Sequence, residues 1–118
     1  HEEALISAIK NDPNWDIFTN ERAIGNYRKR LFESITYVCY DNGAFGGYVR
    51  ALPDDGFAIY ISELFVVPEL RNRTRGRMLI AKVKMNFKHI TVYALSDEDA
   101  YYEKLSYKKV GSVFEIHE

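Results

Sequence analysis

The segment that most restricts how this chain can fold is the run FAIYISELFVV at residues 57–67. Only Ser62 and Glu63 interrupt its apolar and aromatic side chains. A strand that is apolar on both faces is typical of the interior of a sheet with helices on either side. Pro68 follows directly and ends the run, because proline cannot donate a hydrogen bond to a neighbouring strand. The run therefore predicts a central, buried strand.

Before this strand, the hydrophobic period changes from helical to extended. Apolar residues recur at helical spacing first, and β-branched and aromatic residues follow. The expected helices cover 2–10 and 21–34, and the expected strands cover 35–40, 44–52 and 57–67. DNG at 41–43 and PDDG at 53–56 are typical of tight turns between antiparallel strands. This half of the chain predicts two helices and an antiparallel meander.

After the strand, the pattern alternates between helix and strand. Helices are expected at 78–88 and 96–107, and strands at 90–95 and 108–116. The predicted order is ααβββαβαβ, which indicates one mixed α/β domain over residues 1–118, with a central mixed sheet flanked by helices. Cys39 is the only cysteine, so no internal disulfide is possible and a reducing, cytoplasmic compartment is expected.

The charge is unevenly distributed. The formal net charge is −1, yet residues 69–88 contain seven Lys and Arg against Glu69 alone. A general nucleic-acid binder would be strongly basic overall, so one concentrated basic segment better suits a compact anionic ligand. No apolar run approaches the length that spans a membrane, and no membrane partner is expected.

The basic segment RNRTRGR at 71–77 lies between the buried strand and the start of a helix. Backbone N–H groups at a helix N-terminus lack acceptors within the helix and bind phosphate well. A phosphate-binding turn is the preferred interpretation. A solvated run of charges and an arginine-rich arm for nucleic acid stay open on these residues alone.

Two stretches resemble a known family. ELFVVPELRNRTRGRMLI at 63–80 is similar to the cofactor motif of the GCN5-related N-acetyltransferases, the GNAT family, and AYYEKLSYKKVG at 100–111 resembles a later helix–strand element of that family. Thr74 and Ser106 stand where the family pattern has glycine. The resemblance covers roughly 57–116, and the first strand of the family, which should precede residue 2, is missing.

The resemblance implies that an amine attacks acetyl-CoA directly, without a covalent enzyme intermediate and without a metal. It places acetyl-CoA between two parallel strands, here 57–67 and 90–95. The backbone groups expected at pantetheine belong to Phe65, Val66 and Val67. The residues expected at the pyrophosphate are Arg71, Asn72, Arg73, Thr74, Arg75, Gly76 and Arg77.

The resemblance also implies that Tyr102 is the general acid, although a tyrosine that only packs is the alternative. Glu63 is a carboxyl group within an apolar strand, and a buried carboxyl has a raised pKa that suits a general base. An ordered water as base, or a Glu63 that faces solvent or pairs with a basic side chain, stays open.

Other reactive or aromatic residues receive weaker interpretations. Cys39 is expected to be a small buried strand residue rather than a nucleophile, and neither His89 nor His117 has metal-ligand spacing. Trp15, Phe18 and Tyr27 lie where the family forms its acceptor wall, but core packing is the preferred role.

The sequence therefore predicts an N-acetyltransferase that acts on a primary amine of a small molecule or peptide, and dimers are common in the family. A non-catalytic acyl-CoA-binding or partner-binding module is the second hypothesis, and nucleic-acid binding through the arginines is the third.

Overall fold

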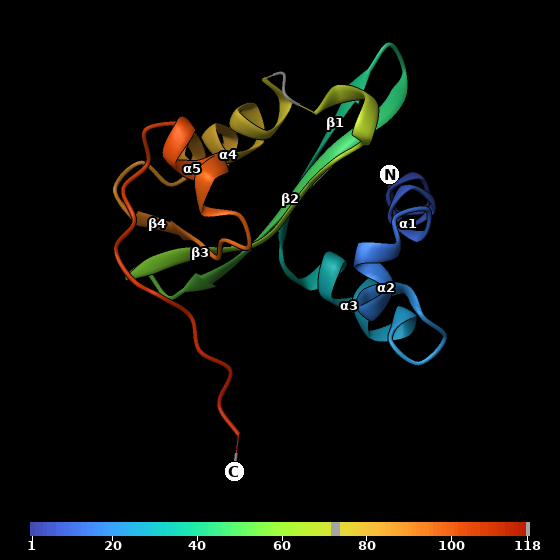
Figure 1. Ribbon diagram of the computed structural model, residues 1–118, viewed down its shortest axis with the longest axis horizontal. Coiled ribbons are helices and arrows are strands. Elements are labelled where there is room, and N and C mark those ends of the chain that lie inside the picture. Colours follow the sequence, from blue (N-terminus) through green and yellow to red (C-terminus); the bar gives the residue numbers. More distant parts are fainter. Residues whose placement is uncertain (72–73, 118) are drawn as a thin grey trace.

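The apolar run forms an interior strand of a four-stranded mixed sheet (Figure 1). This computed structural model describes residues 1–71 and 74–117. The strands lie in the order β1-β2-β3-β4 and are β1 (Ile35–Asp41), β2 (Ala44–Asp54), β3 (Ala58–Val66) and β4 (Thr91–Ala94). The first three strands pair antiparallel, and β4 pairs parallel with β3. The expected mixed sheet is confirmed.

The two predicted turns form because their residues adopt left-handed backbone conformations. Asn42 and Gly43 have φ values of 51° and 82°, and Asp55 and Gly56 have φ values of 39° and 87°. Glycine, asparagine and aspartate reach this region more readily than other residues. The two tight turns set the antiparallel meander.

Helices cover both faces of the sheet (Figure 1). The elements on one face are α1 (Glu2–Lys10), η1 (Pro13–Trp15), α2 (Asp16–Thr19) and α3 (Ile24–Glu33). The other face carries α4 (Arg75–Asn86) and α5 (Asp99–Lys104), and the 3-10 turn η2 (Pro68–Leu70) follows β3. Among the residues described here, none of the helices combines the length and apolar character needed to cross a membrane.

The sheet separates two hydrophobic cores. The first lies under α1–α3 and contains Leu5, Ile6, Ile9, Tyr27, Leu31, Tyr48 and Phe65. The second lies under α4 and contains Val49, Ala51, Ile59, Ile61, Leu79, Ile80 and Val83. Consecutive residues of β2, such as Tyr48 and Val49, point to opposite faces and enter different cores.

The strand expected at 108–116 is not formed, so this part of the predicted order was wrong. The described residues after α5 follow an irregular path that leaves the body of the molecule (Figure 1). Val113, Phe114 and Ile116 are 71%, 79% and 86% exposed. An extended segment without a neighbouring strand pairs no backbone groups and buries little surface, so β propensity alone does not make it a strand.

The pairing of β3 is irregular at one point that matters for the site. The register shifts between Arg50 and Ala51, which pair with Glu63 and Ile61, so Ser62 is an extra residue on β3. Such a β-bulge bends the strand and redirects the side chains that follow. The parallel pairing with β4 covers only Ala58 to Ile61, and β3 continues beyond it.

Candidate active site

The backbone of β3 is open on one side where the pairing with β4 ends. Leu95 N–H donates to Ile61 C=O at 2.9 Å, and the parallel ladder goes no further. On the opposite edge, Val67 N–H donates to Gly46 C=O at 2.9 Å, so Val67 faces β2. Successive residues of a strand direct their backbone groups to opposite edges. Val66 therefore faces the open side.

Of the three residues expected to offer backbone groups to pantetheine, Val66 is the one that faces this opening. Phe65 and Val67 turn toward β2, where a Cβ added at Gly47 would lie 2.4 Å from Phe65 O. The side chain of Phe65 is buried in the first core, with its ring centroid 5.4 Å from that of Trp15. Only the pairing register shows which residue faces the opening.

The segment after β3 leads into the N-terminus of α4. This helix begins at Arg75, with Thr74 as its N-cap. Its first backbone bond runs from Met78 N–H to Thr74 C=O at 2.9 Å. The N–H groups of the first three helical residues have no acceptor within the helix, and they lie at the positive end of its dipole. This arrangement suits an anion.

Thr74 does not need the glycine that the family pattern has at its position. Its backbone has φ −98° and ψ −1°, which is right-handed and open to any residue. Its hydroxyl lies 3.7 Å from Met78 Sδ. The departure from the family pattern therefore costs no backbone strain. Asn72 and Arg73, which were also expected at the cofactor, lie outside the described residues.

Among the described arginines of the basic segment, Arg71 and Arg75 make ion pairs within the protein. Arg71 donates from Nε to Val66 O at 2.7 Å and from Nη2 to Asp12 Oδ2 at 3.2 Å. Arg75 Nη2 donates to Asp41 Oδ1. The first of these contacts lies at the open edge of β3. The positive charge near the helix N-terminus is therefore partly balanced by acidic side chains.

Gly76 is buried and lies against the aromatic side chain of Tyr101 from α5, whereas Arg77 next to it is exposed. A Cβ built on Gly76 would lie 2.0 Å from Tyr101 Oη, 3.2 Å from its Cζ and 3.7 Å from Leu64 Cδ2. The side chain of alanine would not fit there without movement of Tyr101. The glycine of the motif thus permits close packing between the starts of two helices.

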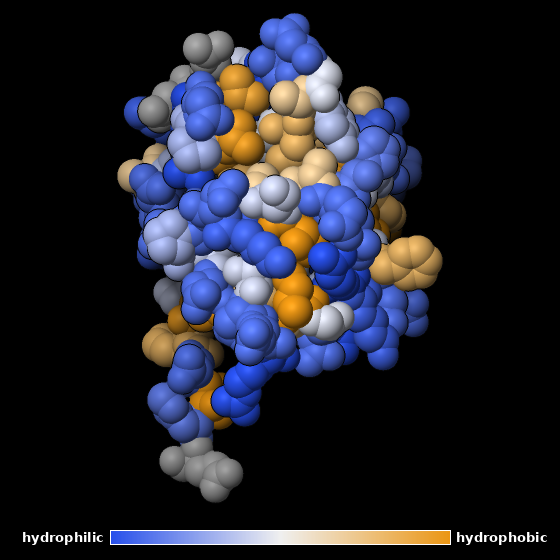
Figure 2. Space-filling model, turned by 90° about the vertical axis from the view of Figure 1, so that its right-hand side faces the viewer, coloured by the Kyte–Doolittle hydropathy of each residue, from blue (hydrophilic) through white to orange (hydrophobic). Residues whose placement is uncertain are grey.

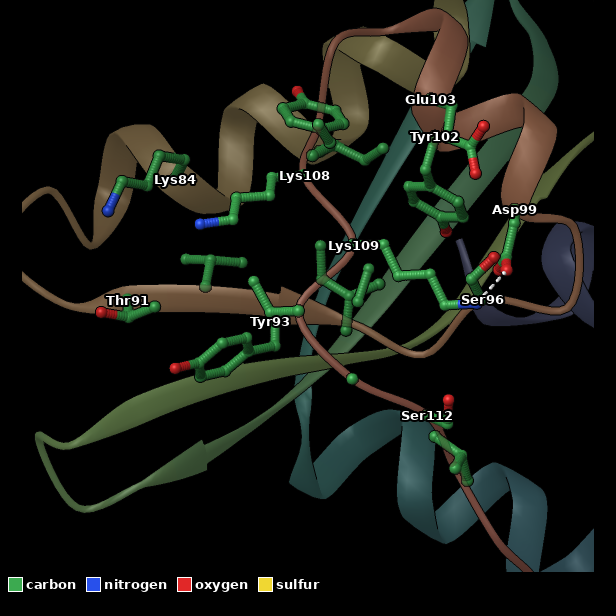
Figure 3. A pocket seen from close by; sticks show the side chains of 18 residues that line it. Lys84, Thr91, Tyr93, Ser96, Asp99, Tyr102, Glu103, Lys108, Lys109 and Ser112 are labelled. Carbon is green, nitrogen blue, oxygen red and sulfur yellow. Dashed lines mark hydrogen bonds and ion pairs between the residues drawn. The ribbon is translucent and has the colours of Figure 1, made fainter.

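Tyr102 extends from α5 into a cavity of about 700 Å³ between β4, α4, α5 and the segment that follows α5 (Figure 3). The Asp99–Lys109 ion pair, at 3.0 Å, lies beside it. Burial raises the pKa of Tyr102 to about 12, and Tyr101 and Asp97 contribute less. The hydroxyl is therefore protonated at neutral pH, as a general acid must be.

Glu63 is buried, at 6% exposure, and its carboxylate is already bound by three neighbours. Arg50 donates from Nε to both carboxylate oxygens, at 2.8 and 2.9 Å, and its Nη2 also contacts Oε2. Tyr48 Oη donates to Oε1 at 2.9 Å and Ser62 Oγ to Oε2 at 2.9 Å. Of the alternatives considered for Glu63, pairing with a basic side chain is the one observed.

This polar network extends into the first core, where Tyr27 Oη and Tyr48 Oη lie 2.6 Å apart. Burial raises the pKa of both phenols, and the hydrogen bonds that Arg50 donates to Glu63 raise the pKa of Arg50. Sequence reasoning did not select Arg50 or Tyr48. The available signal was that Arg50 is the only charged residue within 44–52.

The two expected catalytic side chains lie on opposite faces of the sheet. Glu63 bonds to Tyr48, which belongs to the first core, whereas Tyr102 packs against the second. The open edge of β3 lies between these faces. If both residues act in catalysis, the reactants must therefore reach from one face of the sheet to the other through this open edge.

The aromatic residues on the α1–α3 face pack with one another. Trp15 and Phe18 have ring centroids 5.5 Å apart, and Phe18 and Tyr27 have centroids 5.3 Å apart. On the surface of this side, hydrophobic residues are visible in patches among mainly hydrophilic ones (Figure 2).

Cys39 is half-buried, and burial raises the pKa of its thiol. A raised pKa makes a thiol a weaker nucleophile at neutral pH.

Several solved structures with a similar fold are acetyltransferases. An aminoglycoside acetyltransferase from an uncultured soil metagenomic sample has a TM-score of 0.74 at 25% identity, covering 98% of this chain and 88% of its own. An aminoglycoside N-acetyltransferase in complex with CoA has a TM-score of 0.77 at 15% identity, covering 100% and 88%. A GNAT-family acetyltransferase from Streptococcus pneumoniae has a TM-score of 0.60 at 20% identity, covering 80% of each chain.

A search of curated proteins finds no match to this sequence. The family model described as an acetyltransferase (GNAT) domain, however, matches residues 15–117. This match spans the meander, the basic segment and α5, which together form the open edge, the helix N-terminus and the site of Tyr102. The chain belongs to the GNAT acetyltransferase family.

Proposed function

We propose that this protein transfers the acetyl group of acetyl-CoA to a primary amine. The observation that carries the proposal is the opening beside Val66, which leads along β3 to the N-terminus of α4. An extended ligand arm can pair with an unpaired strand edge, and a diphosphate can bind free N–H groups at a helix start. One ligand with both parts is acetyl-CoA.

The residues present fit this ligand. The main chain of Val66 would hold pantetheine, and the N–H groups of Arg75, Gly76 and Arg77 would hold the diphosphate, together with Arg71 and Thr74. Since Tyr101 lies so close to Gly76, the helix start is held in place by α5. When bound, acetyl-CoA supplies the thioester whose acetyl group passes to the amine.

Tyr102 is proposed as the general acid. Because burial raises its pKa to about 12, it keeps its proton at physiological pH and can donate it to the departing thiolate sulfur. In the described structure, its side chain extends into the cavity beside the end of β4 (Figure 3).

Water, rather than Glu63, is proposed to remove the proton from the attacking ammonium group. The carboxylate of Glu63 already accepts bonds from Arg50, Tyr48 and Ser62, so taking up a proton would break strong charge-assisted contacts. Glu63 is assigned a structural part instead: it fixes the bulge in β3 that precedes the open edge.

The acceptor is proposed to be an amine on a small molecule, or on a peptide. Two of the similar structures are aminoglycoside acetyltransferases, and this supports an amine on a small molecule as the acceptor. The acidic remainder of the chain, outside residues 69–88, would attract such a ligand electrostatically.

The test is release of free CoA thiol from acetyl-CoA with a panel of amines. Replacing Tyr102 by phenylalanine should lower kcat by about 10²-fold or more while thermal stabilisation by acetyl-CoA is kept. Tyr60→Phe, on a half-exposed strand position, serves as the matched control. Unchanged release in Tyr102→Phe would contradict the acid role, and no stabilisation by acetyl-CoA would contradict the cofactor.

A second candidate is an acyl-CoA-binding module without turnover. The observation that favours it is that the carboxylate of Glu63, the one acidic group within β3, is committed to Arg50. This candidate predicts stabilisation by acetyl-CoA with no thiol release for any amine. Nucleic-acid binding receives less support, since Asp12 and Asp41 pair with two of the arginines.

A further inference from the structure

The side chain of Arg71 contacts the end of β3 where the cofactor is proposed to bind. Its Nε donates to Val66 O at 2.7 Å, and its guanidinium lies over the ring of Phe65, 5.5 Å from the centroid. The same guanidinium donates from Nη2 to Asp12 Oδ2 at 3.2 Å. One side chain therefore connects the open strand edge to the loop after α1.

Asp12, the partner of this arginine, is itself held by a local hydrogen bond. Its Oδ1 accepts a bond from Asn14 N–H at 3.0 Å and so caps the 3-10 turn η1. The Asp12 side chain is 12% exposed, whereas that of Arg71 is 44% exposed. Asp12 is thus the fixed partner, and Arg71 is the long, solvent-accessible side chain that can change its position.

A second cavity lies beside this pair. It has a volume of about 490 Å³ and is lined by residues of the loop after α1 and by the end of β3, including Asn11, Asp12, Phe65, Val67, Glu69 and Arg71. The Arg71–Asp12 pair therefore borders an open space between the loop after α1 and the end of β3, rather than a packed interface.

We infer that Arg71 closes the pantetheine-binding edge of β3 until the diphosphate of the cofactor draws it away, with Asp12 as its partner in the closed state. The inference rests on the proposed function. Val66 O has two lone pairs, but the Arg71 guanidinium, with Nε at 2.7 Å, takes up the space beside it on the open side of β3. The pantetheine amide and Arg71 Nε therefore compete for Val66 O.

The diphosphate provides the reason for Arg71 to move. A guanidinium gains more from a dianionic phosphate than from a neutral carbonyl and one partly exposed carboxylate. Arg71 follows η2 directly, on the path from β3 to the N-terminus of α4. The same arginine would thus block a ligand that lacks phosphate and assist a ligand that has it.

The test compares two ligands, CoA and pantetheine, which lacks the diphosphate and the nucleotide. Dissociation constants for wild type, Arg71→Ala and Asp12→Asn would be measured by calorimetry or by NMR titration. Arg71→Ala should bind pantetheine about 3- to 10-fold more tightly than wild type, because one competing hydrogen bond is gone. It should bind CoA no more tightly than wild type, since the contact to the diphosphate is also lost.

Asp12→Asn keeps an Oδ1 acceptor for Asn14 N–H but removes the charge that holds Arg71. It should bind both pantetheine and CoA about 2- to 5-fold more tightly than wild type, because the closed state loses the charge that stabilises it. Arg28→Ala is the matched control, because Arg28 also pairs with an acidic residue, Glu3, at 2.6 Å, on the distant surface of α3. It should change neither affinity.

Tighter binding of pantetheine by both variants is the readout, because loss of structure would weaken the binding of both ligands. Arg71→Ala that binds pantetheine equally or less tightly than wild type overturns the inference, even if CoA binds well. Failure of CoA to bind to any form would instead refute the proposed function, and with it the closed state defined here.

Discussion

Replacement of Gly76 by alanine tests whether the motif glycine is required by packing against Tyr101. The new Cβ would lie 2.0 Å from Tyr101 Oη, whereas an unstrained contact is roughly 3.5 Å or more. The phenol end must therefore move by about 1.5 Å. Forced overpacking of this kind costs about 1–3 kcal/mol, against a gain of about 1 kcal/mol from the higher helix propensity of alanine.

Tyr101→Phe removes the atom at 2.0 Å and leaves Cζ at 3.2 Å, which needs a shift of only a few tenths of an ångström. In the double variant, alanine keeps its helix propensity while most of the overlap is gone. The double variant should therefore be more stable than the sum of the single changes predicts, by about 1–2 kcal/mol.

Urea unfolding of the four proteins, followed by Trp15 fluorescence and far-UV circular dichroism, gives the coupling free energy. Arg77→Ala is the control on the exposed side of the same turn and should change the free energy of unfolding by less than about 0.5 kcal/mol. Additivity of Gly76→Ala and Tyr101→Phe within about 0.3 kcal/mol would refute the packing argument.

Three further predictions concern the buried Arg50–Glu63 ion pair, the backbone conformation of Ser106 and the burial of Tyr102. Glu63→Gln leaves the buried Arg50 without a counter-charge and should lower the free energy of unfolding by about 3 kcal/mol in urea titrations, whereas Arg50→Met together with Glu63→Leu should cost less than Glu63→Gln alone. Ser106 has φ 66°, so Ser106→Gly should stabilise the fold by about 1 kcal/mol and raise Tm by a few degrees in calorimetry. Burial raises the pKa of Tyr102 from 10.0 to about 12, so the folded state binds more protons than the unfolded state in that window, and stability should fall as pH rises from about 10 to 12. Tyr102→Phe should make this alkaline decline shallower, and an unchanged slope would contradict the burial effect.

Local signals were sufficient for most of the fold. The turns at Asn42–Gly43 and Asp55–Gly56 contain residues that adopt left-handed backbone, and the apolar run at 57–67 marks an interior strand. These features depend on residues that are close in the sequence. They could be predicted because short-range sterics and hydrophobic period determine them.

The Arg50–Glu63 pair could not be predicted in the same way. Counting back from the second turn, the pairs Asp54–Ala58 and Ala51–Ile61 place Arg50 opposite Ser62. The bulge moves the register by one residue and brings Glu63 there instead. The residues at the bulge also make contacts outside the hairpin, such as the hydrogen bond from Arg50 Nη1 to Ser34 Oγ at 2.9 Å, so the bulge is not evident from the strand pattern alone.

Two other differences have a similar origin. Whether residue 74 needs glycine depends on its backbone angles, and φ −98° shows that threonine serves there. Whether 108–116 forms a strand depends on a neighbouring strand, which no residue pattern within the segment supplies. In both cases, the missing information concerned tertiary surroundings rather than intrinsic preference.

The division of the interior by the sheet has a consequence for how such a protein can diversify. Side chains beneath α1–α3 contact one core, and those beneath α4 and α5 contact the other. Substitutions in the first core, beneath α1–α3, can therefore reshape that face of the sheet without repacking the second core. Under the proposed function, new acceptor preferences could arise by mutation on one side while the machinery for the acyl donor is inherited unchanged on the other.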